Sequence, residues 1–119
     1  MRYAWRRQGA GLPFYGGPES GSECGWSVGF HPHNPGQIFA TDGRVTCTLH
    51  RSTSDLVVTT KLEEQCLFGV DSITVPVHVL LAVHALDRAL TRLGVLEAIV
   101  EVEGLDFATL KQAIEKEVP

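Results

Sequence analysis

Apolar and polar residues alternate along much of the chain before residue 76, which is the pattern of strands with one buried face. The clearest case begins at Val45. Its apolar positions, expected to face the core, are Val45, Cys47 and Leu49. Its polar positions, expected to be accessible and to contact a protein partner, are Arg44, Thr46, Thr48 and His50. The segment therefore predicts a half-buried strand.

Further segments with strand patterns surround this one. Trp26, Val28 and Phe30 alternate with small residues, and residues 37–40, 56–62 and 72–75 are short apolar or β-branched runs. Asp42-Gly43 separates two alternating runs and predicts a tight hairpin, because Gly adopts positive φ without steric cost. Pro35-Gly36 fits the central positions of a type II turn. Residues 22–76 thus predict a mainly antiparallel meander.

The spacing of apolar residues changes after Pro76, and residues 77–93 contain no Gly or Pro. Apolar residues recur there at helical spacing: Val79, Val83, Leu86, Leu90 and Leu93. Pro76 stands at the first turn, where its missing N–H is tolerated, and Gly94 follows the last apolar position. The pattern predicts one long amphipathic helix over residues 77–93.

Two more elements are predicted after this helix. Residues 96–102 read as a strand, and Asp106 is placed to cap a final helix over residues 107–118. The buried stripe of that helix is expected to be Phe107, Leu110, Ala113 and Ile114. The predicted fold class is α+β: a meander packed on one long helix, then a strand and a C-terminal helix.

Residues 1–21 show no sustained periodicity and are rich in Gly, with Pro13 and Pro18. They predict an irregular arm, followed by a single domain over residues 22–119. A chain of 119 residues with 44% hydrophobic residues is long enough for one domain with its own core.

Charge, hydrophobicity and cysteine content indicate which partners and which cellular compartment the protein is expected to have. The formal net charge of −4 disfavours bulk attraction to nucleic acid. The apolar run near residues 75–86 is too short to cross a membrane, and the basic start lacks the apolar core of a secretory signal. The three cysteines are an odd number and do not suggest disulfide staples. We therefore expect a cytoplasmic protein without membrane contact.

The segment Ala40-Thr41-Asp42-Gly43, followed by further strands and by the Val75-Pro76 step into a long helix, resembles one repeat of the bacterial DNA polymerase sliding clamp. The shared residues are confined to those two motifs. The resemblance implies a module of DNA replication that can form a homo-oligomer and whose helix faces DNA. It implies phosphate contacts from Arg88 and Arg92, which lie four residues apart on the helix.

Two other interpretations of the basic residues stand beside this one. For Arg88 and Arg92, the solvated face of an amphipathic helix is the better supported interpretation, because like charges four residues apart on a helix are common there. The N-terminal Arg2, Arg6 and Arg7, with aromatic residues between them, fit a grip on phosphate and bases or a disordered terminus.

No metal, cofactor or catalytic site is predicted. Cys47 and His50 are three apart on a strand and face opposite ways, and Cys24, His31 and His33 fit no zinc template. Cys47, Cys66 and Ser27 lack the flanking residues of known nucleophile motifs. The sequence predicts a non-enzyme.

Two classes of function remain. The first is a non-catalytic binding module, similar to a sliding clamp, that acts on DNA-processing machinery through protein contacts and weak contacts with DNA phosphate. The second is a small inhibitor or adaptor, of the kind that phages and other mobile elements use against a host protein complex. Both imply a protein partner, and composition does not separate them.

Overall fold

The computed structural model describes residues 3–7, 14–18, 25–31, 34–60, 75–95 and 106–117. These residues form six strands and two helices. The strands are β1 (Tyr3–Arg7), β2 (Phe14–Pro18), β3 (Ser27–His31), β4 (Asn34–Thr41), β5 (Val45–His50) and β6 (Asp55–Thr60). The helices are α1 (Val77–Arg92) and α2 (Phe107–Glu117). The strand predicted over residues 96–102 lies outside the described residues, as do residues 72–74 of the strand predicted over residues 72–75. Val75 is described and belongs to no strand.

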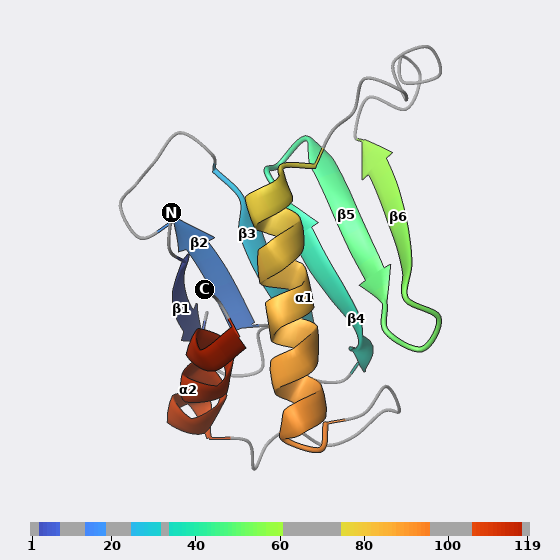
Figure 1. The fold of residues 1–119 in the computed structure, drawn as a ribbon. Helices are drawn as coiled ribbons and strands as arrows, with labels where there is room; N and C mark the ends of the chain where they lie inside the picture. The colour runs from blue at the N-terminus through green and yellow to red at the C-terminus, as the bar shows by residue number, and fades with distance from the viewer. Residues whose placement is uncertain are drawn as a thin grey trace.

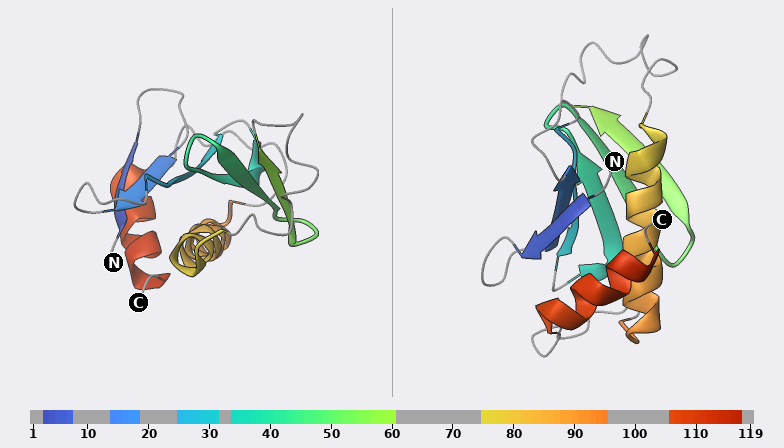
Figure 2. Two further views of the ribbon diagram at one scale, coloured as in Figure 1. Left: turned by 90° about the horizontal axis from the view of Figure 1, so that it is seen from above. Right: turned by 60° about the vertical axis from the view of Figure 1, so that its left-hand side comes forward.

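The strands form one antiparallel sheet in the order β1-β2-β3-β4-β5-β6, so each strand pairs with its neighbour in sequence. Both helices lie on the same face of this sheet (Figures 1 and 2). Helix α1 packs across β3 and β4, and α2 packs against β1. Strands β5 and β6 lie to one side of α1 (Figure 1). The α+β class, with a meander packed against a long helix, is confirmed.

We call the sheet face that meets the helices the inner face and the opposite one the outer face. Buried residues of β3, β4 and β5 line the inner face: Val28, Phe30, Ile38, Ala40, Cys47 and Leu49. They pack against α1 through Val79, Ala82, Val83, Leu86, Ala89 and Leu90, and α2 adds Leu110, Ala113 and Ile114. Removal of this apolar surface from water is the main force that holds the two layers together.

Helix α1 begins where the sequence predicts and ends at Arg92, one residue before the predicted end. Pro76 precedes its first residue, and its carbonyl accepts hydrogen bonds from the N–H groups of Val79 and Leu80. At the other end Gly94 has φ of 78°, its N–H donates to the Thr91 carbonyl, and the Val95 N–H donates to the Leu90 carbonyl. This pair of bonds is a Schellman motif, which satisfies carbonyls that the helix leaves open.

Helix α2 begins after Asp106, as predicted. The Asp106 carboxylate lies 3.4 Å from the Ala108 N–H and accepts a 3.0 Å hydrogen bond from the Thr109 hydroxyl. The contact with Ala108 serves a backbone N–H that lacks an intrahelical partner at the helix N-terminus, and the bond from Thr109 holds the Asp106 side chain in place. Phe107 is half-buried, and the rest of the predicted stripe is buried.

The hairpin between β4 and β5 forms as predicted, with its turn one residue later along the chain. Thr41 pairs with Thr46, so the tip lies at Gly43 and Arg44, and Gly43 has φ of 95°. Asp42 Oδ1 accepts hydrogen bonds of 2.8 Å from the N–H groups of both Arg44 and Val45. The Asp side chain thus sets the turn from the position before the Gly, as short polar side chains often do.

The irregular arm predicted over residues 1–21 is wrong where that region is described. Strands β1 and β2 pair with each other, and Tyr3 and Trp5 are buried in the core. Gly16 stands directly opposite Trp5, and a Cβ at Gly16 would lie 2.4 Å from the indole ring. Gly16, one of the Gly residues that suggested a loop, therefore makes room for an aromatic side chain.

The turn predicted at Pro35-Gly36 is also wrong, because both residues lie inside β4. His31 pairs with Asn34, so β4 has already begun before Pro35. The register shifts between Phe30 and His31, and this irregularity adjoins the position where Pro35 enters the sheet.

Candidate protein-binding surface

The polar residues predicted to face a partner lie where the alternation of β5 places them. Thr46, Thr48 and His50 are half-buried on the outer face, while Cys47 and Leu49 between them are buried on the inner face. Arg44 is exposed, but it lies in the hairpin turn before β5 begins. No described helix lies over the outer face of β4, β5 and β6 (Figure 2). The Thr46, Thr48 and His50 side chains are partly exposed there.

Two apolar side chains join this surface that sequence reasoning did not select. Thr48 pairs with Phe39 of β4 on one side and with Val57 of β6 on the other. Directly paired residues of an antiparallel sheet point to the same face. The three side chains therefore form a row across the outer face, with a partly exposed ring at one end and an exposed Val at the other.

Strand β6 carries the most exposed apolar side chains of the described part of the sheet. Leu56, Val57 and Val58 are exposed to 40%, 44% and 43%. Leu56 and Val58 pair with Leu49 and Cys47 and so face the inner side, whereas Val57 faces the outer side. Since β6 is the last strand in the sheet order, among the described residues its backbone pairs with β5 alone. An edge strand with apolar side chains on both faces is a template for another strand.

The two arginines of α1 are held by a carboxylate of α2. Arg88 Nε lies 2.8 Å from Glu117 Oε2, and Arg92 Nη2 pairs with Glu117 Oε1. The hydrogen bond from Arg88 and the charge of Arg92 lower the pKa of Glu117 below its ordinary value. The structure thus brings Arg88 and Arg92 together, as predicted, and places an anion of the same chain between them.

The other basic residues predicted to contact nucleic acid lie elsewhere. Arg6 and Arg7 are exposed at the end of β1, the edge strand opposite β6. Arg2 lies outside the described residues. The predicted basic residues are therefore divided between β1 and α1.

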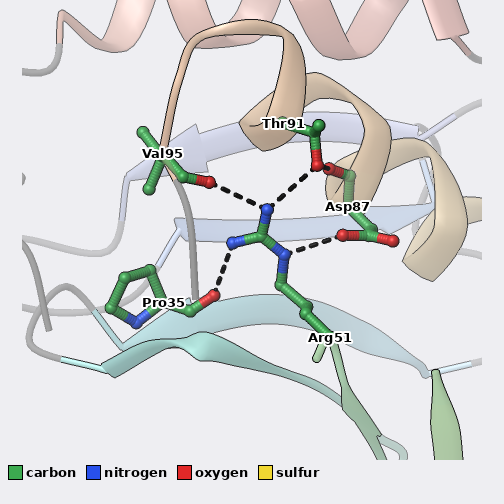
Figure 3. A network of polar contacts seen from close by, with 5 residues as sticks. All are labelled: Pro35, Arg51, Asp87, Thr91 and Val95. Carbon is green, nitrogen blue, oxygen red and sulfur yellow. Dashed lines mark hydrogen bonds and ion pairs between the residues drawn. The ribbon is translucent and has the colours of Figure 1, made fainter. Parts of the chain in front are cut away.

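A buried arginine that sequence reasoning missed joins the sheet to α1. The Arg51 side chain is only 4% exposed, and its Nε lies 2.7 Å from Asp87 Oδ1. Its Nη1 donates to the Pro35 carbonyl at 2.7 Å, and its Nη2 donates to the Val95 carbonyl at 2.8 Å and to Thr91 Oγ1 at 3.1 Å (Figure 3). One planar guanidinium thus connects β4, the end of β5, and the last turn of α1 with its cap. Because the four partners named here all belong to the fold, we interpret this network as structural.

The metal and nucleophile candidates are not brought together among the residues that the structure describes. No group of three potential metal ligands occurs within residues 3–7, 14–18, 25–31, 34–60, 75–95 and 106–117. Cys47 is buried on the inner face, and burial raises the pKa of its thiol. A raised pKa keeps the thiol protonated and unreactive. Cys24, His33 and Cys66 lie outside the described residues.

Comparison with known proteins identifies no relative. No family model matches the chain, and neither a curated protein nor a solved structure matches it. Within the described residues, no helix is both long and apolar enough to cross a membrane.

Proposed function

We propose that this chain is a non-catalytic binding module that recognises a protein through the β5–β6 side of its sheet. The observation that carries the proposal is the run of three exposed apolar residues on edge strand β6. The row of Phe39, Thr48 and Val57 continues this surface over the outer face.

Exposed apolar side chains on an edge strand carry a risk, since such edges pair with other chains. Folded proteins block their edges with charges, Pro or bulges, and β6 contains none of these after Asp55. Addition of a strand to an open edge is a common mode of protein recognition, in which backbone hydrogen bonds supply affinity and side chains supply specificity. These features favour a surface that is used for binding.

The test is affinity capture from a lysate of the source cells with three forms of the chain. In Val57→Lys a charge replaces an exposed residue of β6, and in the matched control Leu81→Lys the same change is made at a residue of α1 that is 50% exposed. We expect the wild type and Leu81→Lys to retain the same protein and Val57→Lys to lose it. Equal capture by all three forms, or capture of nothing, would contradict the proposal.

The identity of the captured protein separates the two functional classes. A replication or repair protein would assign the chain to DNA-processing machinery, as its resemblance to a sliding-clamp repeat implies. A defence or regulatory complex of a host would assign it to the inhibitors and adaptors.

A second candidate function, contact with DNA phosphate, is favoured by the arginines of α1. Arg88 and Arg92 already hold one carboxylate between them, and their side chains remain 51% and 59% exposed. A phosphate would meet the same two donors that Glu117 meets. The net charge of −4 acts against this mode, and we expect isolated chains to bind duplex DNA weakly.

A DNA titration at two salt concentrations tests this second candidate. If the arginines contact phosphates, Arg88→Ala/Arg92→Ala flattens the salt dependence by about two contacts. The charge-matched control is Lys111→Ala/Lys116→Ala, which removes two exposed lysines of α2. A weaker salt dependence of DNA affinity in both double variants would indicate a general charge effect. The absence of salt-sensitive DNA binding in all three forms would exclude contact with DNA phosphate.

A further inference from the structure

The end of α2 meets the two arginines of α1. The two helices lie side by side (Figure 1), and Glu117 is the last residue of α2. One oxygen of its carboxylate accepts a 2.8 Å hydrogen bond from Arg88 Nε, and the other accepts a hydrogen bond from Arg92 Nη2. The Glu117 side chain is only 12% exposed, whereas those of Arg88 and Arg92 are 51% and 59% exposed. One carboxylate thus binds both cations, while more than half of each arginine side chain remains open to solvent.

Glu117 reduces what this arginine pair offers to an anion from solvent. Its charge neutralises one of the two positive charges, and its bonds occupy one N–H donor of each guanidinium. A phosphate that bound beside the carboxylate would also be repelled by it, since both groups are anions. The arginine pair therefore attracts a phosphate more strongly once Glu117 has moved away.

The position of the Glu117 carboxylate depends on the two arginines. The C-terminal end of a helix carries a partial negative charge, which favours cations and disfavours a carboxylate. Glu117 stands at such an end, so α2 itself does not stabilise its charge. Ion pairs with exposed partners are individually weak, because water solvates the charges and the side chains lose freedom. Arginine binds phosphate through paired N–H donors at least as well as carboxylate, so a phosphate group can replace Glu117 at a small cost.

We propose that Glu117 is a competitor, built into the chain, for phosphate at Arg88 and Arg92. It occupies the arginine pair in the free chain and gives way when a phosphate group binds. The inference rests on the second candidate function, contact with DNA phosphate, and names the residue that regulates it. Because the fold tethers the carboxylate beside the pair, it competes at a high effective concentration. Two weak ion pairs set the strength of the competition, so we expect Glu117 to lower the affinity for phosphate groups about 5-fold.

Titration of a labelled duplex oligonucleotide at low salt compares Glu117→Gln with the matched control Glu115→Gln. Glu115 is exposed on the same helix, and among the described residues no ion pair joins it to α1. Both substitutions change the net charge equally, so we expect Glu117→Gln to bind about 5-fold more tightly than the control. In the Arg88→Ala/Arg92→Ala background this advantage should disappear, because the site that Glu117 covers is absent. Circular dichroism melts verify that each form is folded at the temperature of the titration.

Inorganic phosphate is the second probe, because it separates a free phosphate ligand from the backbone of DNA. Nitrogen–proton correlation spectra follow the Nε–H groups of Arg88 and Arg92, which the alanine variants assign. We expect these signals to shift at a lower phosphate concentration in Glu117→Gln than in Glu115→Gln. A gain with both probes would support competition for the phosphates of DNA, and a gain with inorganic phosphate alone would support competition for a free phosphate ligand.

Four results would overturn the inference. They are equal affinity of Glu117→Gln and Glu115→Gln for both probes, a gain that persists without the two arginines, no binding of either probe by any form, and weaker binding by Glu117→Gln. The last would show that Glu117 positions the arginines for the ligand. DNA binding that depends on Arg88 and Arg92 but not on Glu117 would leave the second candidate function intact. A gain with inorganic phosphate and no DNA binding would do the reverse, so the two ideas fail separately.

Discussion

Replacement of Arg51 by Met tests whether the buried guanidinium holds the sheet and α1 together. Arg51→Met retains an unbranched apolar side chain and removes the donors. The change leaves the Asp87 carboxylate without its ion-pair partner and the carbonyls of Pro35 and Val95 without these hydrogen bonds. Buried acceptors without a partner cost free energy, so we expect a large loss of stability.

The size of the loss follows from burial. Removal of one partner from a buried ion pair costs about 3–5 kcal/mol. The Asp87 side chain remains 28% exposed, so water can solvate part of its charge, and the lower limit of about 3 kcal/mol applies. Domains of this size are stable by about 5–15 kcal/mol, so the variant loses a substantial part of the total. The corresponding fall in Tm is roughly 12 °C.

Urea denaturation followed by tryptophan fluorescence measures this loss, since Trp5 and Trp26 are both buried. The control is Arg44→Met, at an exposed arginine of the hairpin turn, which we expect to change the free energy of unfolding by less than about 0.5 kcal/mol. The double variant Arg51→Met/Asp87→Leu should recover part of the loss, because no carboxylate is then left unpaired. A loss below about 1 kcal/mol in Arg51→Met would refute the structural role of the network.

Two further predictions concern the N-terminal strands and the contact between the helices. Gly16→Ala should destabilise the chain by about 1–3 kcal/mol, because its Cβ meets the Trp5 ring at 2.4 Å, and adding Trp5→Leu should make the Ala substitution nearly neutral. Glu117→Gln should lower Tm at pH 7. The bond from Arg88 lowers the pKa of Glu117 from 4.5, so its stabilisation is present above pH 4.5 and is lost as the pH falls through the lowered value. The Tm difference from wild type should therefore vanish in acid, and a constant difference would contradict the assignment.

Local signals were sufficient to predict much of the fold. The limits of α1 follow from Pro76 and Gly94, whose backbone constraints act within one turn of the helix. The inner face of β5 follows from strict alternation at Cys47 and Leu49. In each case the physical cause lies within a few residues of its effect, so one sequence contains it.

The errors arose where a contact between strands decided the structure. Gly16 and Gly17 have low strand propensity, and their local signal is that of a loop. The indole of Trp5 covers Gly16 from the neighbouring strand, and such cover stabilises a Gly in a sheet. Pro35 suggested a turn for a similar reason, because Pro is a frequent turn residue and its place in a sheet depends on the pairing around it.

The polar contacts at the surface and between the layers could not be predicted where they join residues far apart in the sequence. Arg51 donates to groups 16, 36, 40 and 44 residues away, and no spacing rule relates an arginine to partners so distant. Glu117 reaches Arg88 and Arg92 across 29 and 25 residues, and on an amphipathic helix those arginines look identical whether they meet water, phosphate or a carboxylate. The uncharged run of β6 is visible in the sequence, but its importance depends on its position at the sheet edge. That position follows from the order of the described strands, which is why the candidate binding edge emerges only once the sheet is assembled.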